Sequence, residues 1–258
     1  MNLSGETCLV TGGGRGLGRH IVAELAEREV RVLVGVRDPS GWDPIGATGR
    51  ALEVRPVRMD LSSRKEIDIC CDELGEDLRR ISVLVNNAGQ FTGGQLEEQD
   101  TGQVYAMVQA NLTGPIHLTQ RVLPQMLTRG RGKVVNNASI AARTPFPGAS
   151  AYSSTKSGLH GFSEALRREL EETDVGVLEL VTPGLDTDMM DEVQADYEQH
   201  VSDTSGWNHV APEDWAKKVV EAIESDEDVL NPRGAEGLAR LAPDRLVDAA
   251  AGRVFSRR

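Results

Sequence analysis

The chain has 258 residues, a length that one α/β sheet can organise around a single core, so we expect one domain over residues 1–258. Its net charge of −12 argues against a nucleic-acid partner, because phosphate binding requires a basic surface. No apolar run is long enough to span a bilayer, and the start, MNLSGETCLV, lacks the pattern of a signal peptide. We therefore expect a cytoplasmic protein.

The cysteines and histidines are scattered. The five histidines show no HxxxH or HxH spacing that would place two imidazoles on one metal ion. Cys8, Cys70 and Cys71 form neither a CxxC pair nor a secreted disulfide framework. We expect no metal site and three inert thiols in the core.

Short apolar runs alternate with helical segments along the chain. The predicted strands are Thr7–Val10, Arg31–Val36, Val54–Met59, Val83–Asn86, Lys133–Ala138 and Gly176–Thr182, with a short last strand at Val229–Asn231. The predicted helices are Gly16–Arg28, Arg64–Arg80, Thr101–Arg129, Tyr152–Thr173 and Pro212–Ser225. Strands that are apolar through most of their length are typical of a parallel sheet covered on both faces. The pattern predicts an α/β, doubly wound, Rossmann-like sheet with helices on both faces.

Two later segments do not fit this alternation. Residues 185–210 form a long polar stretch, which we predict to be a lid over the substrate. Residues 231–258 form an arginine-rich helical tail whose apolar positions fit either packing over the body of the protein or contact with a membrane surface. We favour packing.

A glycine-rich turn follows the first predicted strand and leads directly into a helix. Glycines allow a sharp turn and let the backbone approach a pyrophosphate, which the amides of the helix N-terminus then bind. The predicted contacts of this turn are Gly12, Gly14, Arg15, Gly16, Leu17 and Gly18.

Further motifs follow this turn in a fixed order. They are Asn86-Asn87-Ala88-Gly89, Asn111, Ser139, and Tyr152 with Lys156. Together with the TGxxxGxG turn, this set resembles the short-chain dehydrogenase/reductase family over about residues 5–225. The resemblance implies a nicotinamide cofactor and hydride transfer to or from a small carbonyl or alcohol.

The resemblance also assigns roles to four residues. Tyr152 would be the general acid or base, and Lys156 would adjust its pKa and hold the nicotinamide ribose. Ser139 would orient the substrate oxygen, and Asn111 would hold a water that links the lysine to solvent.

The spacing of Tyr152 and Lys156 has its own physical meaning. Residues four apart on a helix share one face, so the two side chains can converge. An ammonium about 5 Å from a phenol stabilises the phenolate by roughly 3 kcal/mol at an effective dielectric of 20, or about two pKa units. We therefore expect the pKa of Tyr152 to be lowered toward neutrality.

Other cofactor contacts follow from the resemblance alone. Asp60 and Leu61 would lie near the adenine, and Asn87, Ala88 and Gly89 along the nicotinamide side. Pro183, Gly184 and Thr187 would lie near the carboxamide of the nicotinamide. Pro183 and Gly184 match the family pattern, but the stretch between Gly184 and Thr187 is one residue shorter than in that pattern.

The end of the second predicted strand bears on the choice between NADP and NAD. NAD-preferring relatives usually carry an acid at the position of Val36, and Arg37 follows it here, with Arg15 as a second partner for a 2′-phosphate. Asp38 is the alternative, since a carboxylate there could accept from a free ribose hydroxyl. We favour NADP and keep NAD as the alternative.

The expected function is that of an NADP-dependent carbonyl reductase or alcohol dehydrogenase. An apolar or bulky ketone is the favoured substrate, because the expected lid contains Met189, Met190, Tyr197 and Trp207. One alternative is an NAD-dependent dehydrogenase of a hydroxysteroid, polyol or similar alcohol. Another is a sensor or scaffold that binds the dinucleotide without turnover. We expect a homodimer or homotetramer and favour the dimer, formed through the two longest helices.

Overall fold

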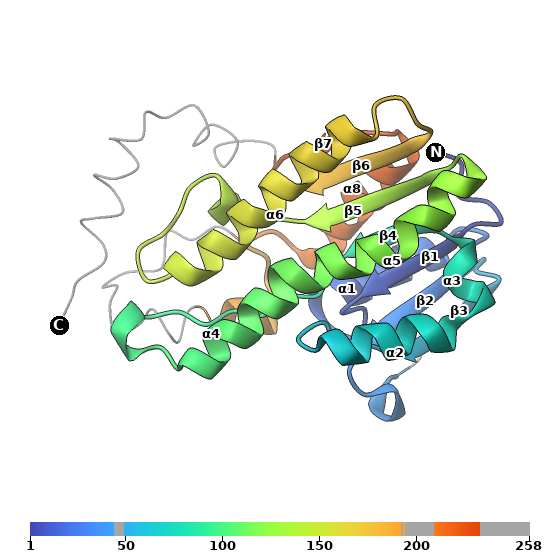
Figure 1. Cartoon of the computed structure of the whole chain (residues 1–258). Coiled ribbons are helices and arrows are strands. Elements are labelled where there is room, and N and C mark those ends of the chain that lie inside the picture. The colour runs from blue at the N-terminus through green and yellow to red at the C-terminus, as the bar shows by residue number, and fades with distance from the viewer. Residues whose placement is uncertain (44–48, 192, 194–208, 233–258) are drawn as a thin grey trace.

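The computed structural model describes residues 1–43, 49–191, 193 and 209–232, and these residues build one parallel sheet (Figure 1). Its strands are β1 Thr7–Thr11, β2 Arg31–Val36, β3 Glu53–Arg58, β4 Ile81–Asn86, β5 Gly132–Asn137, β6 Val175–Leu180 and β7 Val229–Leu230. Every paired strand runs parallel to its neighbour. The predicted doubly wound fold is confirmed.

The order of the strands decides where a ligand can bind. Across the seven-stranded sheet the order is β3-β2-β1-β4-β5-β6-β7, so the chain moves outward from β1 in one direction and then from β4 in the other. At such a switch point the connections leave toward opposite faces, and a crevice opens beyond the carboxyl ends of the strands.

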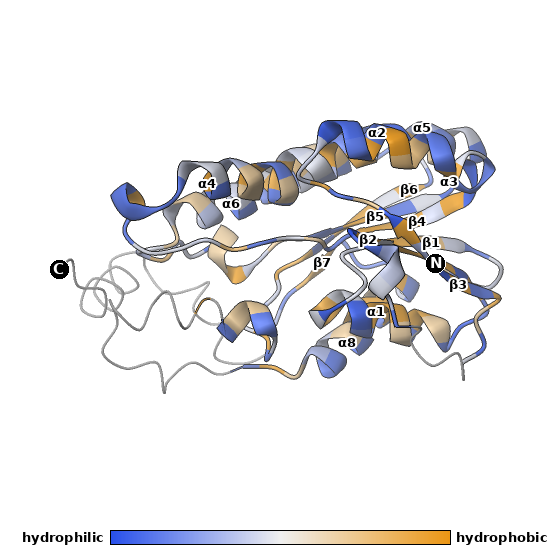
Figure 2. Ribbon diagram, turned by 90° about the horizontal axis from the view of Figure 1, so that it is seen from below, coloured by the Kyte–Doolittle hydropathy of each residue, from blue (hydrophilic) through white to orange (hydrophobic). Residues whose placement is uncertain are grey.

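Helices cover both faces of the sheet (Figure 2). One face carries α1 Gly16–Ala26 and α8 Pro212–Glu224. The other carries α2 Arg64–Leu74, α3 Glu76–Arg80, α4 Thr101–Val108, α5 Gly114–Arg129 and α6 Ser150–Glu169. The layers form because the central strands β1, β2, β4, β5 and β6 bury both of their faces and the long helices bury one apolar side.

Residues of β1 show how the two cores divide. Cys8 and Val10 pack in the core beneath α1 and α8, whereas Leu9 points to the opposite core beneath α2 and α5. Trp215 on α8 is the largest of the fully buried side chains and fills the first core. All three cysteines are buried, and burial raises the pKa of Cys8 to about 12.

Two predicted helices are interrupted. The segment Arg64–Arg80 breaks at Gly75, which has φ 51° and separates α2 from α3. The segment Thr101–Arg129 contains a π-helical turn at Gln109–Thr113 between α4 and α5. Such turns commonly occur at functional sites, and this one contains Asn111.

Most of the predicted lid and nearly all of the predicted tail lie outside the described residues, so their shapes stay predictions. None of the described helices is both long and apolar enough to cross a bilayer.

Candidate active site

A cavity of about 1210 Å³ opens at the carboxyl ends of the strands, at the switch point of the sheet. It runs from the glycine-rich turn between β1 and α1 to the segment that follows β6. All of the predicted cofactor contacts line it, and so do Ser139, Tyr152 and Lys156. Among the predicted site residues, Asn111 does not line the cavity.

The glycine-rich turn fits a dinucleotide phosphate sterically. Gly12 has φ 65°, and a Cβ there would lie 2.9 Å from the Cα of Ala88. At Gly18 a Cβ would lie 2.2 Å from the carbonyl oxygen of Gly12. Both distances are too short for any side chain, so the turn requires glycine at these positions.

The N-terminus of α1 is open to an anion. Its N-cap residue, Arg15, makes no side-chain cap hydrogen bond, and the first turn contains no acidic residue. The first amides of the helix therefore lack a side-chain acceptor, and the helix dipole favours negative charge in front of them. The residues present fit a pyrophosphate.

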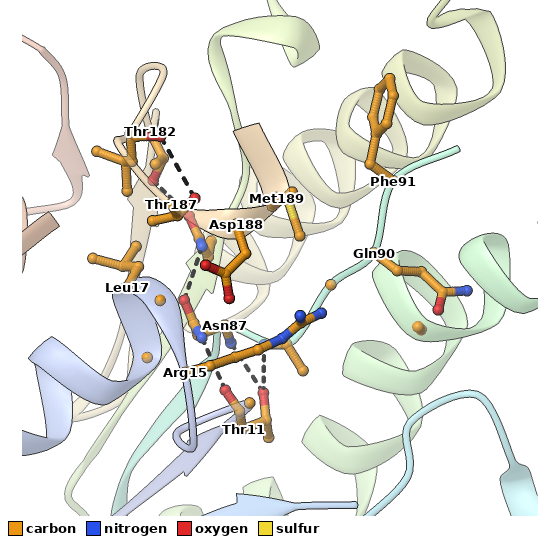
Figure 3. Close-up of a pocket in the computed structure, with 18 of the residues that line it drawn as sticks. Thr11, Arg15, Leu17, Asn87, Gln90, Phe91, Thr182, Thr187, Asp188 and Met189 are labelled. Carbon is orange, nitrogen blue, oxygen red and sulfur yellow. Dashed lines mark hydrogen bonds between the residues drawn. The ribbon is translucent and has the colours of Figure 1, made fainter. Parts of the chain in front are cut away.

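A chain of hydrogen bonds forms the floor of the cavity, and Figure 3 shows part of it. The hydroxyl of Thr11 accepts from the backbone amides of Asn87 (3.0 Å) and Ala88 (2.9 Å). The side chain of Asn137 donates to Asn87 Oδ1 at 3.1 Å and accepts from the Thr182 hydroxyl at 2.5 Å. These bonds join the ends of β1, β4, β5 and β6 into one rigid base.

Sequence reasoning missed Thr11, Asn137 and Thr182 as parts of the site. All three line the cavity, and each is a polar residue at or just beyond the end of an apolar strand. That position was the available signal, because the ends of parallel strands meet at the same edge of a sheet.

The reaction centre is formed by the loop after β5 and the first two turns of α6. The hydroxyl of Ser139 accepts from the backbone amide of Ala141 at 3.1 Å and lies near enough to the phenol of Tyr152 to lower its pKa. The ammonium of Lys156 donates to the backbone oxygen of Asn137 at 2.8 Å and lies 5.7 Å from the centre of the Tyr152 ring. The serine, the tyrosine and the lysine are therefore brought together as predicted.

The predicted direction of the Tyr152 pKa is wrong for the free protein. Burial raises the pKa of this phenol above its ordinary value, and the Ser139 hydroxyl lowers it only in part. Burial also lowers the pKa of Lys156 to about 8, which weakens the charge that was expected to act on the phenol. Desolvation outweighs the attraction between the two groups, because both lie in the same dry volume.

Asn111 lies behind the cavity, not on its wall. Its Oδ1 accepts from the backbone amide of Gln90 and its Nδ2 donates to the carbonyl of the same residue, both at 2.9 Å. The side chain thus fixes the segment that follows Asn87-Ala88-Gly89. The water relay predicted for this residue stays a prediction.

The adenosine end of the cavity contains two exposed arginines, Arg15 and Arg37, with no ion pair within the described part of the chain. Asp38 caps the short helical turn after β2, because its carboxylate accepts from the amide (2.9 Å) and the hydroxyl (2.6 Å) of Ser40. These bonds lower the pKa of Asp38. Trp42, which sequence reasoning missed, also lines this end.

The opposite end is apolar. Phe91 packs edge-on against the ring of Tyr152, with 5.2 Å between ring centres and a 65° interplanar angle. Phe146, Met189 and Met190 extend this wall. The two methionines thus line the cavity, whereas Tyr197 and Trp207, the other apolar residues expected in the lid, lie outside the described residues.

Comparison with known proteins agrees with this geometry. A family model described as "short chain dehydrogenase" matches residues 6–198. An NADP-dependent 3-hydroxy acid dehydrogenase from Schizosaccharomyces pombe is 30% identical over 235 residues, which are 88% of this chain and 90% of the relative.

Solved structures are similar over nearly the whole chain. A variant of actinorhodin polyketide ketoreductase with NADPH is 30% identical with a TM-score of 0.78, covering 90% of this chain and 97% of that one. A short chain dehydrogenase from Burkholderia cenocepacia in complex with NADP is 25% identical with a TM-score of 0.79, covering 97% and 99%. The chain therefore belongs to the short-chain dehydrogenase/reductase family, whose members are oxidoreductases that act on CH–OH or carbonyl groups with a nicotinamide cofactor.

Proposed function

We propose that this protein is an NADP-dependent reductase of apolar or bulky ketones. The observation that carries the proposal is the group formed by Ser139, Tyr152 and the buried Lys156 in one wall of the cavity, between a phosphate-binding turn and an apolar wall. A group of this composition can donate a proton to a carbonyl oxygen next to a bound dinucleotide.

Tyr152 is the proposed general acid. Because burial raises the pKa of its phenol, Tyr152 is protonated at neutral pH and can donate its proton to the oxygen of a ketone. The hydroxyl of Ser139, which lies beside that phenol, can donate to the negative charge that develops on the same oxygen. The nicotinamide, when bound, supplies the hydride.

Lys156 is proposed to stabilise the phenolate that Tyr152 becomes after proton transfer. With a pKa of about 8 it carries its charge through most of the neutral range, and it can also return a proton to the phenolate. Its hydrogen bond to Asn137 holds the ammonium on the floor of the cavity, where the family pattern places the nicotinamide ribose.

The preference for NADP is proposed from the adenosine end. The guanidinium groups of Arg15 and Arg37 are free to pair with a 2′-phosphate, a contact that arginine makes well because its donors form a planar fork. Asp38 accepts both hydrogen bonds from Ser40 through Oδ1, which holds this carboxylate on the turn after β2 and leaves Oδ2 as the competing contact for a ribose hydroxyl. The relatives whose names or titles specify NADP or NADPH support the same preference.

An NAD-dependent dehydrogenase of secondary alcohols is the second candidate. One observation favours it: the Asp38 carboxylate lines the cavity, and the bonds from Ser40 that lower its pKa stabilise its charged form. The chemistry at Tyr152 would be unchanged, so the two candidates differ only in the nucleotide.

Titration of the purified protein with NADPH and NADH tests the proposal. Binding is followed by nucleotide fluorescence, and the tighter ligand is then used with a panel that grades ketones from acetone to bulky aryl and decalone substrates. We expect tighter binding of NADPH and oxidation that depends on the bulky ketones. Tighter binding of NADH would favour the second candidate. Binding without turnover of any carbonyl or alcohol would favour a sensor, and absence of binding would contradict the cofactor assignment.

A further inference from the structure

A carboxylate is buried in the sheet behind the reaction centre. Glu179, next to the last residue of β6, has a side chain that is 0% exposed, and β6 lies between β5 and β7. Burying a charge of this kind costs several kcal/mol unless it is paired and hydrogen-bonded.

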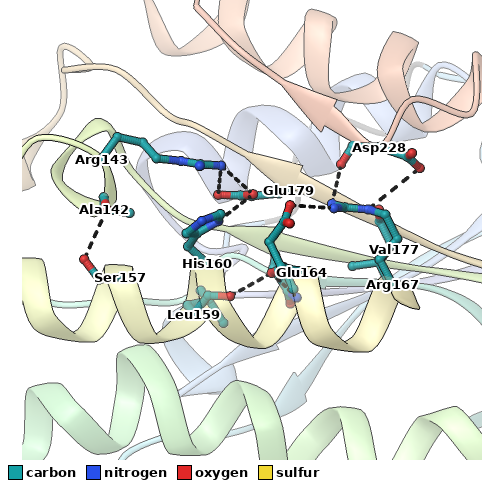
Figure 4. Close-up of polar contacts among 12 residues, drawn as sticks. Ala142, Arg143, Ser157, Leu159, His160, Glu164, Arg167, Val177, Glu179 and Asp228 are labelled. Carbon is teal, nitrogen blue, oxygen red and sulfur yellow. Dashed lines mark hydrogen bonds and ion pairs between the residues drawn. The ribbon is translucent and has the colours of Figure 1, made fainter. Parts of the chain in front are cut away.

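Two side chains hold this carboxylate, as Figure 4 shows. Nη2 of Arg143 donates to both oxygens of Glu179, at 3.2 and 3.0 Å. Nδ1 of His160 lies 3.0 Å from Oε2. The buried charge is therefore satisfied by one group from the loop after β5 and one from α6.

These two partners are close in sequence to the reacting groups. Arg143 directly follows a short 3-10 helix, Ile140–Ala142, and the N-cap of this helix is Ser139. His160 lies one helical turn after Lys156 on α6. Glu179 thus joins the two segments of the chain that carry the serine and the lysine.

A second contact ties the same two segments together. The hydroxyl of Ser157 donates to the carbonyl of Ala142 at 3.1 Å (Figure 4). On the other side of the loop, the amide of Ile140 donates to the carbonyl of Thr182 at 3.0 Å. The 3-10 helix is therefore held on α6 and β6 by polar contacts at both of its ends.

Glu164 sits near this group but belongs to a different set of contacts. Its carboxylate pairs with Nη1 of Arg167 at 2.8 Å, and Arg167 also donates to the carbonyls of Val177 and Asp228. His160, Glu164 and Glu179 bring three potential metal ligands within 4.8 Å of one another. Because arginines already neutralise both carboxylates, this geometry favours a protein ion-pair cluster over a cation site.

We propose that Glu179 is a positioning residue: held between Arg143 and His160, its carboxylate fixes the loop that carries Ser139 against the helix that carries Tyr152 and Lys156. The proposal rests on the proposed reductase function, in which Ser139 and Tyr152 act on one oxygen atom. A displacement of the serine by a fraction of an ångström would weaken both its interaction with the phenol and its contact with the reacting oxygen.

The variant Glu179→Gln tests the proposal, because it keeps the shape of the side chain and removes its charge. Glu164→Gln is the matched control, since it neutralises a carboxylate of the same cluster that does not contact the serine loop. We expect Glu179→Gln to lower kcat for ketone reduction by about tenfold or more through misplacement of Ser139, with the Kd for NADPH unchanged. Glu164→Gln should keep the wild-type kcat.

Ultraviolet titration of the Tyr152 phenol gives a readout that does not need turnover. The difference between each protein and its own Tyr152→Phe derivative isolates this phenol from the other two tyrosines. The Ser139 hydroxyl lowers the pKa of Tyr152, so a loosened loop should raise that pKa further in Glu179→Gln and leave it unchanged in Glu164→Gln. A purely structural role would lower only Tm.

Two variants of Arg143 cover the case in which Glu179→Gln does not fold. A single nitrogen of Arg143 makes both bonds to the carboxylate, so Arg143→Lys should retain more turnover than Arg143→Met. Unchanged kcat and unchanged Tyr152 titration in Glu179→Gln and Arg143→Met would overturn the proposal. If wild type reduces no ketone, the reductase function fails, while the titration still decides whether Glu179 positions the serine.

Discussion

The two ends of the cavity are built in different ways. The adenosine end consists of backbone amides, glycines and exposed arginines around β1, α1 and the end of β2, and it offers preformed donors to an anion. The reaction end consists of Ser139 from the loop after β5 and of Tyr152 and Lys156 from α6, and desolvation shifts the pKa values of the tyrosine and the lysine. Binding at the first end depends on shape and charge, whereas reactivity at the second depends on burial.

The largest expected effect is at the reaction end. Tyr152→Phe removes the proton donor and keeps the ring that packs against Phe91. Ketone reduction should fall by about 10³-fold, within the range for loss of a general acid. The Kd for NADPH should stay within about twofold, because the binding end keeps its donors. Steady-state kinetics and nucleotide titration measure both quantities, and substantial residual turnover would contradict the assignment of Tyr152.

Lys156→Met tests whether burial of the Lys156 ammonium lowers the free energy of unfolding. The folded-state pKa of about 8 lies below the ordinary value of 10.5, so folding disfavours the charged amine. Below pH 8 the variant should be more stable than wild type by roughly 3 kcal/mol, at about 1.36 kcal/mol for each pKa unit.

The pH dependence of this gain checks its cause. In wild type the unfolded chain binds the proton more tightly between pH 8 and 10.5, so wild-type stability rises with pH across that window. The advantage of Lys156→Met should therefore shrink as pH approaches 10.5, even though turnover is lost at every pH. Urea unfolding at pH 7 and pH 10 measures it, and an equal gain at both values would rule out burial of the charge as the cause.

Gly12→Ala tests the shape of the binding end. The added methyl would require φ 65° of an alanine and would lie 2.9 Å from the Cα of Ala88. Weaker NADPH binding by about tenfold or more is expected, because strained backbone of this kind costs on the order of 1–3 kcal/mol. Isothermal titration calorimetry measures the loss, and wild-type affinity would contradict the fit of this turn to a phosphate.

Arg37→Ala separates charge from shape at the same end. Loss of one charge-assisted contact should weaken NADPH binding by about tenfold, since such contacts contribute roughly 1.5–3 kcal/mol. NADH binding should not change, because NADH lacks the 2′-phosphate. Titrations of the variant with NADPH and with NADH measure both affinities. Equal losses of affinity for the two nucleotides would show that Arg37 does not bind the 2′-phosphate.

The smallest effect serves as a control for both ends. Gly161 lies on α6 with an ordinary backbone conformation, and a methyl group added to it would have no neighbouring atom within 4 Å. Gly161→Ala should stabilise the protein by about 0.5–1 kcal/mol through helix propensity, with kcat and the Kd for NADPH unchanged. A fall in either quantity would show that α6 transmits surface changes to the reaction centre.

The sequence by itself determined the fold class, the glycine-rich turn and the shared helix face of Tyr152 and Lys156, whereas Ser139 was added to this pair by the family resemblance. These features depend on local signals: apolar runs, glycine spacing, and two residues one helical turn apart. The same local rules placed Arg64–Arg80 in one helix, although Gly75 has a positive φ that ends α2. They also gave no sign of the π-helical turn at Asn111.

Only the tertiary structure decided the electrostatics of the reaction centre and the packing around it. The sequence predicted that Lys156 lowers the pKa of Tyr152, but burial of both groups reverses that direction in the free protein. Likewise, Glu179 reads as an ordinary strand residue until the sheet brings Arg143 and His160 to it. Desolvation and long-range pairing depend on segments far apart in the chain, and no local spacing records them.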